Sequence, residues 1–181
     1  MVLRAAGKDD STATLLREAL AGKQGEMEGA YTAGSAFLQS HLGIQSVGER
    51  SRILDTAMNP NSLYALRPDR KGAVNGWARK ATVEEMRAVV EFLQSQGLTL
   101  DQVQKVVSEH PPTLVYDIEQ RLRPTFEYLA SLGMTPAATV VRRPSLLGLG
   151  ADASLRRIVG YLQEVDGRSL AEIEELLATT L

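Results

Sequence analysis

Residues 122–147 read LRPTFEYLASLGMTPAATVVRRPSLL and carry the signals of one complete helical repeat. Tyr128-Leu129 lies near the end of a helical segment and precedes Gly133, which accepts the left-handed backbone that ends many helices. Thr135-Pro136 predicts the start of a second helix, because proline at the first helical position loses no hydrogen bond. Pro144-Ser145-Leu146 ends that helix and begins a short turn that carries a leucine into the core. The stretch therefore predicts two helices and a short turn of helix.

The same landmarks recur along the chain at a spacing in the low to mid thirties of residues, a length typical of helical repeats. The aromatic-leucine pair and its glycine return as Phe92-Leu93 with Gly97, and as Tyr161-Leu162 with Gly167. The proline-leucine turn returns as Pro112-Thr113-Leu114 and, more loosely, as Pro60-Asn61-Ser62-Leu63 after Phe37-Leu38. We therefore expect an all-α protein whose second half is a short array of repeats.

Helix starts in the second half carry the capping-box pattern Ser/Thr-x-x-Glu/Gln, in which two side chains satisfy free backbone donors reciprocally. The pattern occurs as Thr82 with Glu85, Thr99 with Gln102, and Ser169 with Glu172. The first two predict helices to about Gln96 and Glu109. Between these starts, one helical face collects five apolar residues that we expect to be buried: Leu155, Ile158, Val159, Leu162 and Val165. We also expect Leu176, Leu177 and Leu181 to close the end of the array.

The first half is less regular. We expect a helix of about ten residues from Ser11, a small-residue-rich helix ending near His41 to Gly43, and a third over Val47 to Met58. The chain then divides into an N-terminal helical extension (1–34), a degenerate first repeat with a basic insertion (35–82) and regular repeats (83–181), within one folding unit.

Composition excludes several classes of site. The chain has no cysteine, so it forms no disulfide, thiolate metal site or cysteine nucleophile. His41 and His110 lie in dissimilar contexts without acidic partners at ligand spacing, so we expect no metal. No window reaches the roughly 18 apolar residues of a membrane-spanning helix. Residues 1–80 carry 11 Lys and Arg against 8 Asp and Glu, whereas residues 81–181 carry 9 against 14.

The repeat landmarks resemble those of the mitochondrial transcription termination factor (mTERF) family. The likeness covers about residues 83–181, with a degenerate copy from about residue 35, and it rests on these residues: Leu122-Arg123-Pro124, Tyr128-Leu129, Leu132-Gly133, Val140-Val141, Arg142-Arg143-Pro144 and Leu146-Leu147. It implies repeats of helix, helix and 3₁₀ turn in a right-handed, α-solenoid-like stack. It also implies residence in a plastid or mitochondrion, soluble or peripherally attached, and often nucleic-acid binding in organellar gene expression.

Nucleic-acid binding draws most of its affinity from phosphates neutralised by Lys and Arg, so a binder should present a basic stripe. Three arginine pairs recur near the repeat junctions and are the candidates: Arg121 and Arg123, Arg142 and Arg143, and Arg156 and Arg157. The alternative is that these arginines are solvated helix-end charges in an acidic half of the chain.

A second basic cluster lies in residues 67–80 and is the chain's only one with an aromatic residue: Arg67, Arg70, Lys71, Trp77, Arg79 and Lys80. Such a segment could bind RNA by charge and stacking. It could equally anchor a protein partner, because Trp and Arg are enriched at interface hot spots, and we favour that interpretation.

Two further patterns offer no chemistry. Residues 148–153 fit G-x-G-x-x-A, but no strand precedes them, so we interpret the stretch as a linker rather than a dinucleotide loop. The carboxylates Glu84-Glu85 and Glu172, Glu174 and Glu175 lie at helix starts, where the helix dipole favours negative charge. We therefore expect neither an enzyme nor a cofactor.

Two functions remain. The first is a scaffold subunit that docks its helical stack onto a larger organellar assembly, such as a ribosome, a polymerase or a photosynthetic complex; the small number of repeats and the acidic second half favour it. The second is an organellar DNA- or RNA-binding factor that uses the junction arginines and the basic segment.

Overall fold

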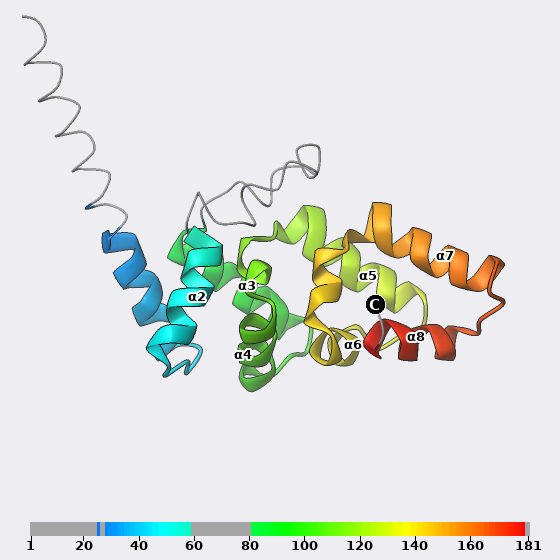
Figure 1. The fold of residues 1–181 in the computed structure, drawn as a ribbon, viewed down its shortest axis with the longest axis horizontal. Coiled ribbons are helices and arrows are strands. Elements are labelled where there is room, and N and C mark those ends of the chain that lie inside the picture. Colours follow the sequence, from blue (N-terminus) through cyan, green and yellow to red (C-terminus); the bar gives the residue numbers. More distant parts are fainter. Residues whose placement is uncertain (1–24, 26–27, 59–80, 180–181) are drawn as a thin grey trace, which may run out of the picture.

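The computed structural model describes residue 25 and residues 28–58 and 81–179. Helices and short helical turns make up most of these ranges, and no strand occurs in them. The expected all-α class is confirmed. The elements follow one another along an elongated array, from the helix of residues 28–40 at one end to α7 and α8 at the other (Figure 1).

Two helices form the N-terminal end of the array. The first runs through residues 28–40, and α2 spans Val47–Met58, as expected from the sequence. Arg50 of α2 is buried and joins them: its Nε donates to Ser35 Oγ at 3.0 Å, and its Nη1 donates to the carbonyls of Ile44 and Gln45 at 2.8 and 2.7 Å. A single guanidinium thus fixes the connection between two helices.

The first regular repeat comprises α3 (Val83–Ser95), α4 (Leu100–Glu109) and the 3₁₀ turn η2 (Pro111–Val115). Both capping boxes predicted for this repeat are present, with Thr82 N to Glu85 Oε2 and Thr99 N to Gln102 Oε1 each at 2.9 Å. Gly97 has a φ of +95°, so its lack of a side chain allows the turn between the helices.

The second and third repeats begin with an unexpected element, a π-helical turn. The second repeat comprises η3 (Ile118–Leu122), α5 (Arg123–Ser131), α6 (Pro136–Arg142) and the 3₁₀ turn η4 (Pro144–Gly148). The third comprises η5 (Gly150–Leu155), α7 (Arg156–Glu164) and α8 (Leu170–Thr179). The predicted order of helix, helix and 3₁₀ turn is confirmed.

The interpretation of residues 148–153 as a linker was wrong, because η5 makes most of that stretch helical and leads directly into α7. In the equivalent η3, the amide of Leu122 donates to the carbonyl of Asp117, five residues back. Pro124 offers a physical reason there, since it has no amide hydrogen and its ring would clash with the carbonyl four residues earlier. A wider turn avoids that clash.

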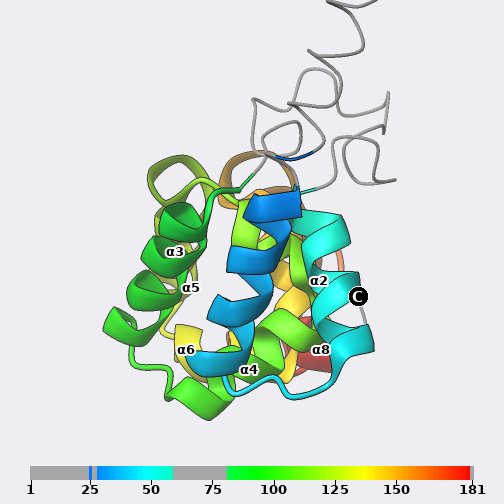
Figure 2. The same ribbon diagram turned by 90° about the vertical axis from the view of Figure 1, so that its left-hand side faces the viewer.

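The second helices of successive repeats contact one another, in the order α2, α4, α6 and α8, and form one row. The first helices of the second and third repeats, α5 and α7, lie above α6 and α8 in Figure 1, and Figure 2 shows α3 and α5 across the array from α2 and α8. The turns η2 and η4 touch each other, and their leucines, Leu114 and Leu146, are buried. Leu93 and Leu129 of the aromatic-leucine pairs lie in the same continuous core. The expected aliphatic spine is therefore present; the predicted hand of the stack stays a prediction.

The apolar face of α7 is buried only in part. Leu155 and Val159 are buried and Ile158 and Leu162 are half-buried, whereas Val165 is 66 % exposed, so the expectation for Val165 was wrong. The reason is positional: α7 ends at Glu164, and no described helix follows on the outer side of α7 to cover its end. At the other helix of this repeat, Leu177 is buried and Leu176 half-buried.

Several expectations fall outside the described ranges: the helix from Ser11, the turn at 60–63, and Leu181. The proposed division at residues 34/35 and 82/83 stays a prediction, and the helix through residues 28–40 crosses the first of these boundaries. Among the helices that the structure describes, none combines the length and apolar character needed to cross a bilayer.

Candidate nucleic-acid interface

All six junction arginines lie in the described ranges, and they occupy two kinds of position. Arg121, Arg123, Arg156 and Arg157 lie at or just before the starts of the first helices α5 and α7, while Arg142 and Arg143 lie at the end of α6. The six residues of the basic segment 67–80 all lie outside the described ranges. The candidate interface can therefore be assessed only at the arginine pairs.

Arg121 is directed into the protein. Its Nε donates to the carbonyl of Leu147 at 3.1 Å, its Nη2 donates to the carbonyl of Gly148, and its guanidinium lies 4.8 Å from the centre of the Tyr116 ring. These contacts join the π turn of the second repeat to the 3₁₀ turn that ends it. The guanidinium thus satisfies carbonyls at the end of a helical turn, where donors are otherwise missing.

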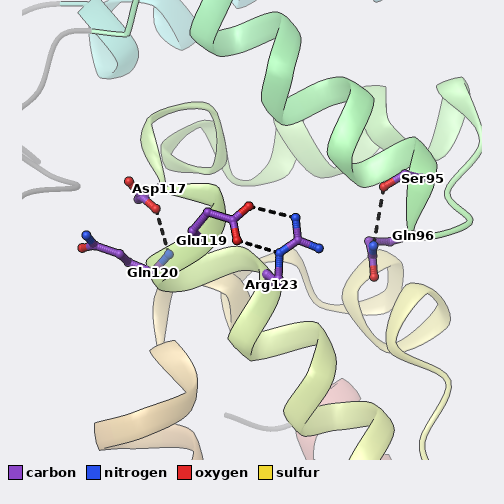
Figure 3. A network of polar contacts seen from close by, with 6 residues as sticks. All are labelled: Ser95, Gln96, Asp117, Glu119, Gln120 and Arg123. Atoms are coloured by element: carbon purple, nitrogen blue, oxygen red, sulfur yellow. Dashed lines mark hydrogen bonds and ion pairs between the residues drawn. The ribbon is translucent and has the colours of Figure 1, made fainter.

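Arg123 binds a carboxylate and a ring. Its Nε and Nη2 donate to the two oxygens of Glu119, both at 2.8 Å, and its guanidinium lies 5.3 Å from the centre of the Phe92 ring (Figure 3). The hydrogen bond from Arg123 lowers the pKa of the Glu119 carboxyl below its ordinary value. This bidentate ion pair neutralises the positive charge of Arg123 that a phosphate would need.

Arg142 links α6 to α8, two second helices of successive repeats. Its Nη2 contacts both carboxylate oxygens of Glu175 in α8, at 2.9 and 3.1 Å, and this hydrogen bond lowers the pKa of Glu175. Arg143 is half-buried and donates from Nε to Ser145 Oγ at 3.2 Å. Both arginines at this junction thus have partners within the chain.

The last pair differs between its two members. The guanidinium of Arg156 lies 4.5 Å from the centre of the Tyr128 ring. Burial raises the pKa of the Tyr128 hydroxyl, and the nearby charge of Arg156 opposes that rise in part. Arg157 is exposed. Of the six, Arg157 is the arginine best placed to meet a phosphate.

A groove of about 490 Å³ lies between α3 and the turns η2 and η3. Three carboxylates line it, from Glu85, Asp117 and Glu119, and none of the lining residues that the structure describes is a Lys or Arg. Each carboxylate has a partner nearby. Glu85 takes part in its capping box. Asp117 accepts from the amide of Gln120, and Glu119 binds Arg123 (Figure 3). The described part of the lining thus offers a phosphate backbone carboxylates and no cation, which disfavours its binding there.

The structure also shows a regular contact that we did not predict. One arginine from each first helix lies over an aromatic ring of the preceding first helix: Arg87 over Phe37 at 5.3 Å, Arg123 over Phe92 and Arg156 over Tyr128. In the three regular repeats the arginine precedes that helix's own aromatic by five residues, as R-x₄-(F/Y)-L. That spacing is visible in the sequence, but the partner of each arginine is not.

The described residues contain no group of three or more His, Cys, Asp or Glu side chains that could hold a metal ion. His110 ends α4, and its Nε2 lies 2.7 Å from the hydroxyl of Tyr116. The ring of His41 stacks on Phe37, with centroids 5.2 Å apart. Glu85 and Glu172 accept hydrogen bonds from the backbone amides of Thr82 and Ser169, as the capping-box pattern predicts.

These features define a class of protein, an array of helix–helix–3₁₀ repeats with ring-and-arginine contacts between neighbours. The family model of mTERF matches residues 83–180, just over half of the chain, and the protein belongs to the mTERF family. Members of that family are generally nucleic-acid-binding, non-enzymatic factors of organellar gene expression. Comparisons with curated proteins and with solved structures found no match.

Proposed function

We propose that this chain is a non-enzymatic scaffold subunit that docks through its helical stack onto a larger assembly in a plastid or mitochondrion. One observation carries the proposal: five of the six junction arginines have partners within the chain. A guanidinium bound to a carboxylate, carbonyl or ring must give up that contact before it can bind a phosphate. The acidic groove adds to this cost.

Sedimentation of an organelle extract through a density gradient tests the proposal. The full chain should travel with a large particle, and treatment with RNase and DNase should leave it associated with protein components. Migration as a free monomer without nuclease would contradict the proposal. Release by nuclease alone would instead support the second candidate.

The second candidate is binding of organellar DNA or RNA, favoured by family membership, by exposed Arg157 and by the basic segment 67–80. It predicts binding that weakens steeply with salt, by a factor of about 10³ or more between about 50 and 200 mM for six phosphate contacts. A gel-shift titration of the full chain with duplex DNA and single-stranded RNA measures this. We expect weak binding, and the variant Arg157→Glu would identify any contribution from the described surface.

A further inference from the structure

The contacts between a ring and an arginine of the next repeat form a regular series, and one ring at the same position, that of Tyr161, is exposed. The rings of Phe37, Phe92 and Tyr128 each lie beneath the arginine of the next first helix, and these residues are only 5, 7 and 8 % exposed. Tyr161 holds the same position in α7, five residues after Arg156, and it is 58 % exposed. Helix α7 thus presents an exposed ring at the position where each of the three earlier helices has a ring covered by an arginine.

Two other apolar side chains of the third repeat are exposed, and both lie within nine residues of Tyr161 along the chain. Val165 follows α7, and Leu170 begins α8 and is 40 % exposed. We name Tyr161, Val165 and Leu170 the end face. In Figure 1 the junction between α7 and α8 lies at the extremity of the array opposite the helix of residues 28–40. Exposed apolar residues grouped in this way mark an interaction site more often than singly scattered ones do.

The charge around the end face is negative. Residues 161–179 include five carboxylates, from Glu164, Asp166, Glu172, Glu174 and Glu175, against one basic residue, Arg168. Asp166 contacts Arg168, and Glu175 contacts Arg142, so these two are neutralised within the chain. Glu164 is exposed and lies one turn beyond Tyr161 on α7. A basic partner would be attracted to this end and an acidic one repelled.

We propose that the end face binds a basic amphipathic helix of a partner protein, which places an arginine over the ring of Tyr161 and aliphatic side chains against Val165 and Leu170. The partner would continue the stack by the contact that already joins its repeats. This inference rests on the proposed docking function and names the surface that performs it.

A second copy of the chain fits the end face poorly. At the opposite end of the part of the chain that the structure describes lies the helix of residues 28–40. There the position five residues before the aromatic Phe37 is Thr32, not an arginine. A head-to-tail pair would therefore leave Tyr161 without its cation. A partner helix that brings an arginine supplies what the series requires.

Fluorescence anisotropy with a labelled synthetic peptide tests the proposal. The peptide copies residues 150–165, the segment that covers Tyr128 within the stack, and carries Glu164→Lys to make it basic. The full chain should bind it, and Tyr161→Ala should weaken binding about tenfold, while Tyr161→Phe, which keeps the ring, should not. Val47→Ala is the matched control, because Val47 is a similarly exposed apolar residue of α2. A peptide that also carries Arg156→Gln should bind about tenfold more weakly.

Equal affinity of the wild type and Tyr161→Ala would overturn the proposal, as would equal affinity of the two peptides. A concentration-dependent dimer that Tyr161→Ala abolishes, seen by analytical ultracentrifugation, would assign the end face to a second copy and also overturn it. Unchanged thermal unfolding of Tyr161→Ala is expected because the ring is exposed. The gradient experiment distinguishes failure of this proposal from failure of the docking function. If the wild type and Tyr161→Ala both sediment with a large particle, the docking function stands but the end face does not perform it.

Discussion

At the scale of single residues, the arginines divide by what they bind. Arg121 reaches two backbone carbonyls of η4, and its planar fork can satisfy both at once. Lysine has the same charge but not the fork. Replacing Arg121 with lysine therefore distinguishes a structural role of this side chain from a phosphate-binding role, because the charge is kept and the fork is lost.

We expect Arg121→Lys to lower the free energy of unfolding by about 1–2 kcal/mol, because at least one partly buried carbonyl loses its donor. Urea unfolding followed by circular dichroism measures this. Arg157→Lys serves as the control and should stay within about 0.5 kcal/mol of wild type, since Arg157 is exposed. Unchanged stability of Arg121→Lys, combined with loss of nucleic-acid binding, would show that Arg121 serves phosphate rather than the fold.

At the scale of elements, side-chain caps decide where the helices of the first regular repeat begin. Thr82 Oγ1 accepts from the amide of Glu85 at 3.2 Å, and Thr99 Oγ1 accepts from the amide of Gln102 at 3.3 Å. Thr135 occupies the same N-terminal position before α6, but its side chain makes no capping hydrogen bond and Pro136 follows it. The three threonines form a natural comparison.

Thr82→Ala and Thr99→Ala should each reduce stability by about 1 kcal/mol, the usual cost of a lost N-cap, whereas Thr135→Ala should cost less than half as much. Thermal and urea unfolding of the three variants would measure the difference. If Thr135→Ala proved as costly as the other two, the capping hydrogen bonds would not be the source of the effect.

At the scale of the whole molecule, lowered carboxylate pKa values connect stability to pH. Hydrogen bonds lower the pKa of three exposed glutamates: Glu119 through Arg123, Glu172 chiefly through the Ser169 amide, and Glu175 through Arg142. A group with a lowered folded pKa stabilises the fold above its unfolded pKa, and this stabilisation is lost as pH falls through the folded value.

We therefore expect a stability plateau near neutral pH and a decline once the pH falls below the ordinary glutamate value. The triple variant Glu119→Gln, Glu172→Gln and Glu175→Gln should be less stable at pH 7 and should decline more shallowly in acid. Urea titrations of both proteins between pH 7 and pH 3 measure the two slopes. Parallel curves would mean that other carboxylates control acid unfolding. Added salt should diminish the contributions of the two ion pairs, because all three glutamates are exposed.

Much of the architecture could be predicted from the sequence because its signals are local. The capping boxes at Thr82 and Thr99, the glycine at residue 97 and the proline-leucine turns each act within a few residues of themselves. The π-helical turns before α5 and α7 escaped prediction, since apolar spacing does not distinguish one widened turn from an ordinary helix or a linker.

An all-α chain with a repeated pair of helices follows from the amino-acid order alone, as does the position of six arginines at the repeat junctions. What those arginines bind depends on the folded arrangement of the repeats. Arg123 and Arg156 lie over rings more than twenty residues away, and Glu175 reaches Arg142 from another repeat. The same holds for Tyr161, which shares its local pattern with Phe92 and Tyr128 but not their burial. Whether a side chain is buried or paired depends on the neighbouring repeat that its helix packs against, and the local sequence of one repeat does not specify that neighbour.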